Sequence, residues 1–151
     1  MYSQMTLADA DRVLPLYIDY YNTCEEGRWT PETAGKRIRQ VLGMAGGYGL
    51  LLEDENGPAG FVMGYFKQYD DLISFILEEI VIERTRQGKG LGSALLAETE
   101  RRVRKLGAAG VELSSVNDKM HGHFYSKAGY GNAKNFVIKV KWFPEPTECP
   151  F

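Results

Sequence analysis

The chain has 151 residues, a formal net charge of −2 and a hydrophobic content of 44%. This length suits one domain that buries about two-thirds of its unfolded surface, and it is too short for two, so we expect a single domain over residues 1–151. We expect no membrane partner, because no apolar stretch approaches the roughly 20 residues of a membrane span. Without a basic arm, nucleic acid is not expected as a partner either. No secretory signal pattern opens the chain, which favours a cytoplasmic protein.

The two cysteines, Cys24 and Cys149, lie far apart, and neither has metal-ligating residues at suitable spacing. We therefore expect free thiols, as in a reducing compartment, with no structural disulfide and no bound metal. The chain also contains no repeat, low-complexity tract or linker that would divide it.

Two helical patterns follow a short strand expected at residues 1–6. Thr6-Leu7-Ala8-Asp9 is close to a capping box, and the apolar spacing after it predicts a helix through Tyr21. Thr30-Pro31-Glu32 predicts the start of a second helix, because threonine is a common N-cap and proline a common first helical residue. Residues 43–49, rich in glycine, are expected to end it.

A hairpin is predicted next. Residues 48–54 and 58–67 have strand composition and are joined at Asp54-Glu55-Asn56-Gly57. Because Asn-Gly supplies the positive φ angles of a tight turn, we expect the two strands to be antiparallel neighbours.

A glycine-rich loop separates the next strand pattern, residues 73–82, from a helical pattern running from Leu91 to Leu106. The first N–H groups of a helix have no internal partner and carry the positive end of its dipole. Glycine at alternate positions removes the Cβ atoms that would keep a ligand away from them. We therefore predict a diphosphate site made by backbone amides, with Arg84, Arg86 and Lys89 adding positive charge. The loop residues are Gln87, Gly88, Lys89, Gly90, Leu91, Gly92 and Ser93.

Two other phosphate loops fit less well. A Walker loop needs lysine followed by Ser/Thr directly after its last glycine, whereas Lys89 lies between glycines. A dinucleotide fingerprint needs glycine or alanine at position 93, which is serine, although Glu112 falls near its acidic position. Only about forty-five residues follow Leu106, too few for the further βαβ units of a Rossmann domain.

The last third of the chain reads as strand, helix and strand. Residues 111–116 are a strand that a helical crossover makes parallel to residues 73–82. Residues 118–128 are expected to be a short helix ended by Gly129, and residues 135–143 alternate as a final strand. Residues 144–151 read as a tail.

Two of these motifs are shared with a known family. Gln87-x-x-Gly90-x-Gly92, after a strand ending in Glu-Glu-Ile-Val-Ile, resembles the acetyl-coenzyme A loop of the GNAT-superfamily N-acetyltransferases. Phe124-Tyr125-Ser126-Lys127-Ala128-Gly129-Tyr130 resembles that family's F-Y-x-K-x-G-F/Y signature. The resemblance covers about residues 73–130. It implies an α/β (α+β) fold with a mixed, centrally splayed sheet flanked by helices on both faces, and an acyltransferase that uses acetyl-CoA and no metal.

The resemblance also implies coenzyme contacts. The family binds the pantetheine arm through main-chain groups at the positions of Ile80, Val81 and Ile82, which hydrogen-bond like an added strand. Its tyrosine beside the coenzyme sulfur matches Tyr125, whose phenol can protonate the departing thiolate. Family members commonly have asparagine seven residues before this tyrosine, where this chain has Asp118. Either Asn117 takes that contact or Asp118 only caps the helix.

For the catalytic base, Glu78 matches the position from which several family members draw one, directly or through water. Glu78 and Glu79 interrupt an otherwise apolar strand, and strand alternation places them on opposite faces, so that only one is expected to face the acceptor. A carboxylate paired with an arginine or lysine is the competing interpretation. His121 lies one turn before Tyr125 and is placed to assist.

The acceptor is expected between the first two helices, the hairpin and the final strands. Tyr21, Glu25 and Trp29, together with Glu78, are the predicted substrate contacts, and this acidic and aromatic mixture suits a small cationic primary amine. Tyr20, Glu26, Asp70 and Asp71 lie in the same regions of the sequence.

The predicted activity is acetyl transfer to that amine by direct attack in a ternary complex. A non-catalytic acyl-CoA sensor and a protein acetyltransferase, acting on lysine or an N-terminus, are the alternatives. Pairing at a free sheet edge would make a homodimer, and a monomer is the alternative.

Overall fold

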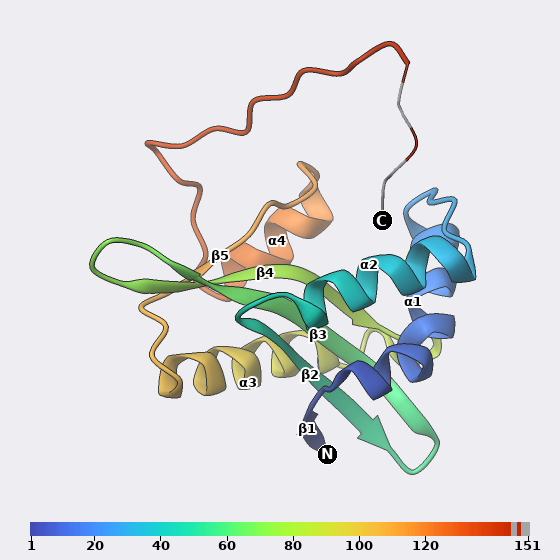
Figure 1. Ribbon diagram of the computed structural model, residues 1–151. Coiled ribbons are helices and arrows are strands. Elements are labelled where there is room, and N and C mark those ends of the chain that lie inside the picture. The colour runs from blue at the N-terminus through green and yellow to red at the C-terminus, as the bar shows by residue number, and fades with distance from the viewer. Residues whose placement is uncertain (146–147, 149–151) are drawn as a thin grey trace.

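The computed structural model describes residues 1–145 and 148, and its centre is a five-stranded mixed sheet in the order β1-β2-β3-β4-β5 (Figure 1). The first four strands pair antiparallel, and β5 pairs parallel to β4. The helical crossover between β4 and β5 explains this change of direction. The strands are β1 Tyr2–Gln4, β2 Gly47–Asp54, β3 Gly57–Gln68, β4 Ile73–Ile82 and β5 Val111–Glu112.

Four α-helices accompany the sheet: α1 Ala10–Cys24, α2 Pro31–Gly43, α3 Leu91–Lys105 and α4 Lys119–Lys127. Short 3₁₀ turns, η1 Leu7–Asp9 and η2 Arg84–Arg86, precede α1 and α3. The predicted cap of α2 is confirmed, since Thr30 accepts a hydrogen bond from the Thr33 N–H at 3.1 Å. At α4, Asp118 accepts a hydrogen bond from the His121 N–H at 2.7 Å, which is the capping alternative for this residue. In the described part of the chain, none of these helices is both long and apolar enough to cross a bilayer.

Helices cover both faces of the sheet, as predicted, because alternate strand residues point to opposite sides. Leu51, Phe61 and Val81 pack in one apolar cluster with α1 and α2, whereas Leu50 and Val62 pack in a second with α3 and α4. Figure 1 shows α3 on one side of the sheet and the α1–α2 pair on the other. The sheet therefore has a separate hydrophobic core on each of its two faces.

The β2–β3 hairpin is where the sequence predicted it, but its turn differs in detail. Gly57 has a positive φ of 101°, whereas Asn56 does not lie in the left-handed region. Instead, the Asn56 N–H donates to the Asp54 side chain at 2.8 Å. The register between β2 and β3 shifts by one residue just before the turn. This bulge accommodates a turn conformation that differs from the predicted one.

A second irregularity, in β4, opens the sheet. Met63 pairs with Glu79 but Gly64 pairs with Leu77, so Glu78 is the extra residue of a β-bulge. Position 64 must be glycine, because a Cβ there would lie 2.0 Å from the Ile76 carbonyl oxygen. Pairing of β4 with β5 ends at Ile76 and Glu112, so β5 is shorter than the predicted residues 111–116. Beyond that point β4 and the following chain separate, which gives the splayed sheet.

The predicted final strand, residues 135–143, is wrong: these residues form neither strand nor helix. Alternating apolar and polar residues indicate that a segment can present an apolar face. To form a strand, the segment also needs a neighbouring strand that hydrogen-bonds with its N–H and C=O groups. Most of the predicted tail 144–151, including Cys149, lies outside the described residues. Cys24 is exposed.

Candidate acetyl-coenzyme A site

The glycine loop has a run of unpaired backbone N–H groups at the start of α3. Gly88 and Gly90 have positive φ angles of 76° and 78°, and a Cβ at either position would meet open space. The Ala94 N–H is the first of the helix to bond back, to the Gly90 carbonyl at 3.1 Å. The N–H groups from Gly88 to Ser93 donate to no other described residue. Together with the positive end of the helix dipole, these donors fit a diphosphate.

The side chains around the loop hold it in place. Gln87 Nε2 donates to the Ile82 carbonyl at 3.0 Å, which ties the loop to the end of β4. Arg84 pairs with Asp19 on α1 at 2.7 Å, and Arg86 donates to the Pro58 carbonyl at 2.7 Å. Of the three cations predicted to assist the diphosphate, two are thus engaged with the protein, and Lys89 is exposed.

A cavity of about 420 Å³ leads from the loop to α4. Its far side is formed by Tyr20 and Cys24 of α1 and by His121, Phe124 and Tyr125 of α4. Gly92 lies so close to Phe124 that a Cβ would stand 3.2 Å from the ring. The two recognised motifs, more than thirty residues apart, therefore meet across one cavity.

The β4 edge in this cavity is free to bind an extended ligand. Ile80, Val81 and Ile82 pair with β3 on one side, but the pairing with β5 on the other side stops at Ile76. Ile80 and Ile82 also line the cavity. Main-chain groups on such an edge can hydrogen-bond like an added strand, so the edge fits the amide-containing pantetheine arm.

Tyr125 lies inside the cavity as a protonated phenol. Burial, together with the negative charges of Glu79 and Glu25, raises the pKa of Tyr125 to about 12. Its ring packs against Phe124 and Tyr130, with centroids 4.9 and 5.7 Å away. Its hydroxyl bonds to no other described side chain, so the proton is available to a ligand.

Glu78 and Glu79 lie on the same side of the sheet, which corrects the expectation of opposite faces. Arg37 of α2 contacts both, with Nη2 2.7 Å from Glu78 and Nε 3.2 Å from Glu79. The bulge at Glu78 is the cause, because an extra residue cancels one step of the alternation. Neither glutamate is among the residues that line the cavity.

Glu79 is the more firmly held of the two. Its side chain is 11% exposed and accepts hydrogen bonds from Tyr17 at 3.1 Å, from Tyr21 and from Arg37. Burial, followed by the charge of Glu79, raises the pKa of Tyr17 and of Tyr21. Glu78 has a 30% exposed side chain and the single ion pair with Arg37. Tyr21, a predicted substrate contact, is therefore engaged with Glu79.

Glu25, another predicted contact, reaches α4. Its carboxylate lies 2.7 Å from His121 Nε2, and His121 Nδ1 lies 2.8 Å from Asp118. Burial lowers the pKa of His121, but hydrogen bonds to Asp118 and Glu25 outweigh it and raise the pKa above its ordinary value. The third contact, Trp29, packs edge-on against Tyr17 with centroids 5.2 Å apart.

Asp118 caps α4 and binds His121, whereas Asn117 is exposed. The structure thus shows Asp118 in the capping role and leaves the coenzyme contact of Asn117 a prediction. Sequence reasoning missed Arg37, because nothing local marks an arginine that will reach two glutamates on another element. The Asp118-x-x-His121 spacing at a helix start was the available signal for the contact between those two residues.

The family comparison agrees with this geometry. The family model described as an acetyltransferase (GNAT) domain matches residues 45–131, which include the β4 edge, the glycine loop and α4. The chain belongs to the GNAT acetyltransferase family. The chain is 34% identical over 96 residues to the uncharacterized protein YxbD of Bacillus subtilis (strain 168). That match covers 63% of this chain and 56% of the relative, so the chain spans little more than half the length of the relative.

Solved structures share the GNAT fold at low sequence identity. A probable acetyltransferase superposes with a TM-score of 0.79 at 18% identity, over 96% of this chain and 99% of the other. A ribosomal-protein-alanine N-acetyltransferase from Brucella melitensis biovar Abortus 2308 gives 0.74 at 15%, over 95% and 99%. An aminoglycoside acetyltransferase from an uncultured soil metagenomic sample, in complex with sisomicin, gives 0.70 at 13%, over 96% of both chains. These neighbours confirm the predicted fold.

Proposed function

We propose that this GNAT domain transfers the acetyl group of acetyl-CoA to a small cationic primary amine by direct attack in a ternary complex. The main support for this proposal is that unpaired backbone N–H groups of the glycine loop, the free edge of β4 and Tyr125 all line one cavity. These are the groups needed to hold a diphosphate, align an extended arm and supply a proton. A module that only sensed acyl-CoA would need the first two alone.

The coenzyme side works through the backbone. The N–H groups of residues 88–93 hold the diphosphate, and the main chain of residues 80–82 aligns the arm, so that the thioester points toward α4. Bound acetyl-CoA supplies the activated acetyl group. Asn117 is proposed to contact the coenzyme near the start of α4.

Tyr125 is the proposed proton donor. With a pKa of about 12 its phenol is protonated at neutral pH. As the amine nitrogen bonds to the acetyl carbon and the carbon–sulfur bond breaks, the Tyr125 Oη proton passes to the departing sulfur. The extra proton that the nitrogen carries after it bonds to the acetyl carbon then passes to the Tyr125 phenolate, so the products are the neutral amide and the free thiol of coenzyme A.

Glu78 is the proposed proton acceptor for the ammonium. Of the two β4 glutamates it has fewer partners and greater exposure, which leaves carboxylate oxygen available. Because Glu78 does not line the cavity, the proton reaches it through water. Glu78→Gln should flatten the acid limb of the rate profile, and an unchanged limb in this variant would assign the role to another group, with His121 in the cavity next to be tested.

Charge favours a cationic acceptor. Glu25 and Glu79 both act on Tyr125 electrostatically, so the amine end of the cavity is acidic. Tyr20 lines it and donates to Glu25 at 3.5 Å, adding an aromatic wall beside the carboxylate. A small ammonium would gain both charge attraction and cation–π contacts there. Tyr21, Trp29 and Glu78 complete the proposed acceptor region.

The test is a calorimetric titration with acetyl-CoA, followed by thiol release in the same sample across polyamines, aminoglycosides, amino acids and lysine or N-terminal peptides. We expect micromolar binding and release that depends on a small polycationic amine. Release with peptides alone would make the protein a protein acetyltransferase. Binding without release for any amine would favour the sensor, and absence of binding would contradict the coenzyme site.

A further inference from the structure

The first turn of α4 has one shielded side chain, that of His121. The residues around it, 119–120 and 122–123, are exposed, whereas the His121 side chain is only 19% exposed. Its imidazole reaches the residue that follows α1, where Nε2 lies 2.7 Å from the Glu25 carboxylate. The start of α4 is therefore held against the end of α1 through His121.

Both nitrogens of the His121 ring face a carboxylate. Nδ1 lies 2.8 Å from Asp118, whose carboxylate also accepts a hydrogen bond from the His121 backbone N–H at 2.7 Å. A neutral imidazole can donate from one nitrogen only, so the protonated ring is the form that serves Asp118 and Glu25 at once. The cap of its own helix thus fixes the direction of the ring, which presents a charged donor to Glu25.

Glu25 is held firmly on the α1 side. Its N–H donates to the Tyr21 carbonyl at 3.1 Å, and the Gly27 N–H donates to the same oxygen at 2.9 Å. Between them Glu26 has a positive φ of 56°, which is uncommon for a residue other than glycine. Such a conformation persists where the surrounding contacts impose it, and it is frequent at functional sites. The turn after α1 is therefore fixed in the conformation that brings Glu25 to α4.

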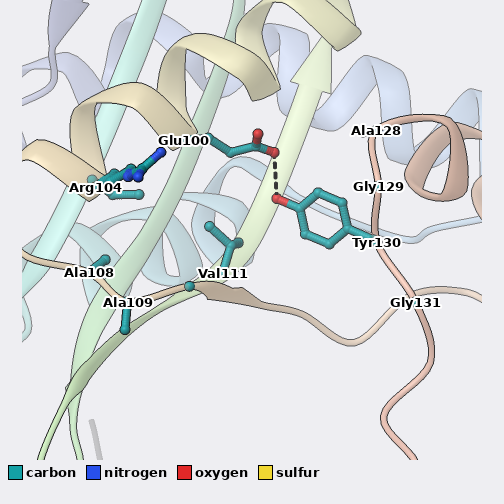
Figure 2. Close-up of a pocket in the computed structure, with 11 residues that line it drawn as sticks. Glu100, Arg104, Ala108, Ala109, Val111, Ala128, Gly129, Tyr130 and Gly131 are labelled. Carbon is teal, nitrogen blue, oxygen red and sulfur yellow. Dashed lines mark hydrogen bonds between the residues drawn. The ribbon is translucent and has the colours of Figure 1, made fainter.

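His121 and Tyr125 share one face of α4. They are four residues apart, which places them one turn from each other, and both line the cavity of the candidate site. On the other side of Tyr125, its ring packs against Tyr130. Figure 2 shows the Tyr130 hydroxyl pointing to Glu100 of α3, to which it bonds at 2.8 Å. The segment that carries Tyr125 is thus connected to α3 at its end and to α1 at its start.

The contact between Glu25 and His121 also joins two walls of the cavity. Tyr20 and Cys24 of α1 form part of one wall, and α4 forms the wall that carries Tyr125. Among the residues that the structure describes, this is the one hydrogen bond between α4 and residues 10–30. Without it, the first turn of α4 would have no polar attachment to α1, and Tyr125 would be free to move with it.

We propose that Glu25 and His121 form a clasp between α1 and α4 that positions Tyr125 beside the departing sulfur. The inference rests on the proposed acetyl transfer, because the clasp acts through the proton that Tyr125 donates. In this role His121 is a positioning residue and does not itself take the ammonium proton. A displacement of about 1 Å at a reacting group can cost on the order of 100-fold in rate. Loss of the clasp should therefore lower kcat and leave coenzyme binding intact.

The first test is steady-state turnover with a double-mutant cycle. Glu25→Ala and His121→Ala should each lower kcat about 10-fold or more, with the acetyl-CoA dissociation constant unchanged by calorimetry. The double variant should lose no more than either single variant, because both changes remove one contact. In a Tyr125→Phe background, Glu25→Ala should cause no further loss. Glu26→Ala and His123→Ala, at exposed neighbouring positions, are the matched controls and should keep their turnover.

Glu25→Gln separates the clasp from the negative charge. A glutamine amide can donate to Nε2 of the neutral His121 ring while Nδ1 donates to Asp118, so the contact is kept and the charge is lost. This variant should keep most of its kcat and raise the KM of a cationic amine. A fall in kcat as large as that of Glu25→Ala would contradict positioning by this contact.

Hydrogen exchange tests the clasp without any turnover. The amides of residues 122–125 should exchange about 10-fold faster in Glu25→Ala and in His121→Ala than in the unchanged chain, since α4 loses its attachment to α1. An unchanged chain with no turnover would contradict the proposed function, and exchange would then decide whether the clasp exists.

Four results would overturn the proposal. The first is unchanged exchange in α4, and the second is faster exchange with full kcat. The third is a set of kcat losses that multiply in the double variant or in the Tyr125→Phe background, which would show that Glu25 and His121 act independently of each other or of Tyr125. The fourth is a flattened acid limb of the rate profile in His121→Ala, which would make His121 the proton acceptor.

Discussion

The two sides of the cavity are built in different ways. The proposed coenzyme side uses the backbone of consecutive residues, 88–93, and requires mainly that glycine adopt positive φ angles. The proposed acceptor side depends on side chains from separate elements. Glu79, which does not itself line the cavity, bonds to Tyr17, 62 residues away in sequence, and to Arg37, 42 residues away. The backbone N–H groups are present in any sequence that keeps the glycines. The positions of the acceptor side chains, in contrast, depend on the packing of every helix and strand that carries them. The first side should therefore respond to backbone geometry and the second to side-chain chemistry.

The largest effect is expected from Gly90→Val. Gly90 has a φ of 78° at the start of α3, and a branched side chain there would both strain the loop and cover its donors. We expect the acetyl-CoA dissociation constant, measured by calorimetry, to rise about 1,000-fold through the loss of several charge-assisted hydrogen bonds. Gly107→Val is the matched control, because Gly107 also has a positive φ, of 109°, and open space around it, but lies at the far end of α3. Equal loss of binding in both variants would mean that strain alone is responsible.

Tyr125→Phe should separate binding from chemistry. Removing the phenol proton should lower kcat about 100-fold, as for loss of a general acid, while the acetyl-CoA dissociation constant stays the same. Tyr130→Phe, which removes a hydroxyl bonded to Glu100 outside the cavity, is the control and should keep its turnover. Full turnover of Tyr125→Phe would remove this residue from the mechanism.

On the acceptor side, Glu79→Ala should lower the free energy of unfolding in urea by about 2 kcal/mol, because it leaves the hydroxyls of Tyr17 and Tyr21 without their acceptor. Coenzyme binding should be unchanged, in contrast with Gly90→Val. Glu32→Ala, on the exposed first turn of α2, serves as the control and should cost less than about 1 kcal/mol. A similar loss for both glutamates would contradict a special role for the Glu79 network.

The smallest effect is a pH dependence at His121. Its pKa is raised in the folded protein, so the protonated imidazole stabilises the fold fully below the ordinary pKa of 6.5, and this contribution is lost as pH rises through the folded pKa. Glu25→Gln should lower the pKa measured by NMR titration and reduce this pH dependence of unfolding. Glu26→Gln, at the exposed neighbouring position, should leave both unchanged. An unaltered titration in Glu25→Gln would show that the 2.7 Å contact is absent in solution.

Local patterns predicted most elements and the conformation of the glycine loop. Thr30 caps α2, Asp118 caps α4, and the glycines at 88 and 90 open α3, because each of these depends on a few consecutive residues. The same reasoning failed where strand formation depends on pairing with a neighbouring strand. Residues 135–143 alternate like a strand, but the described structure gives them no neighbour.

The sequence alone therefore determined the glycine loop, the helix starts and the two motifs that identify the family, since backbone conformation and capping are local. Only the tertiary structure decided that the β4 bulge turns Glu78 and Glu79 toward Arg37. It also decided that Glu25 of the segment after α1 meets His121 of α4, 96 residues away. The physical reason is that such contacts depend on how strands pair and helices pack, and one residue of slippage in β4 reverses the direction of every side chain that follows.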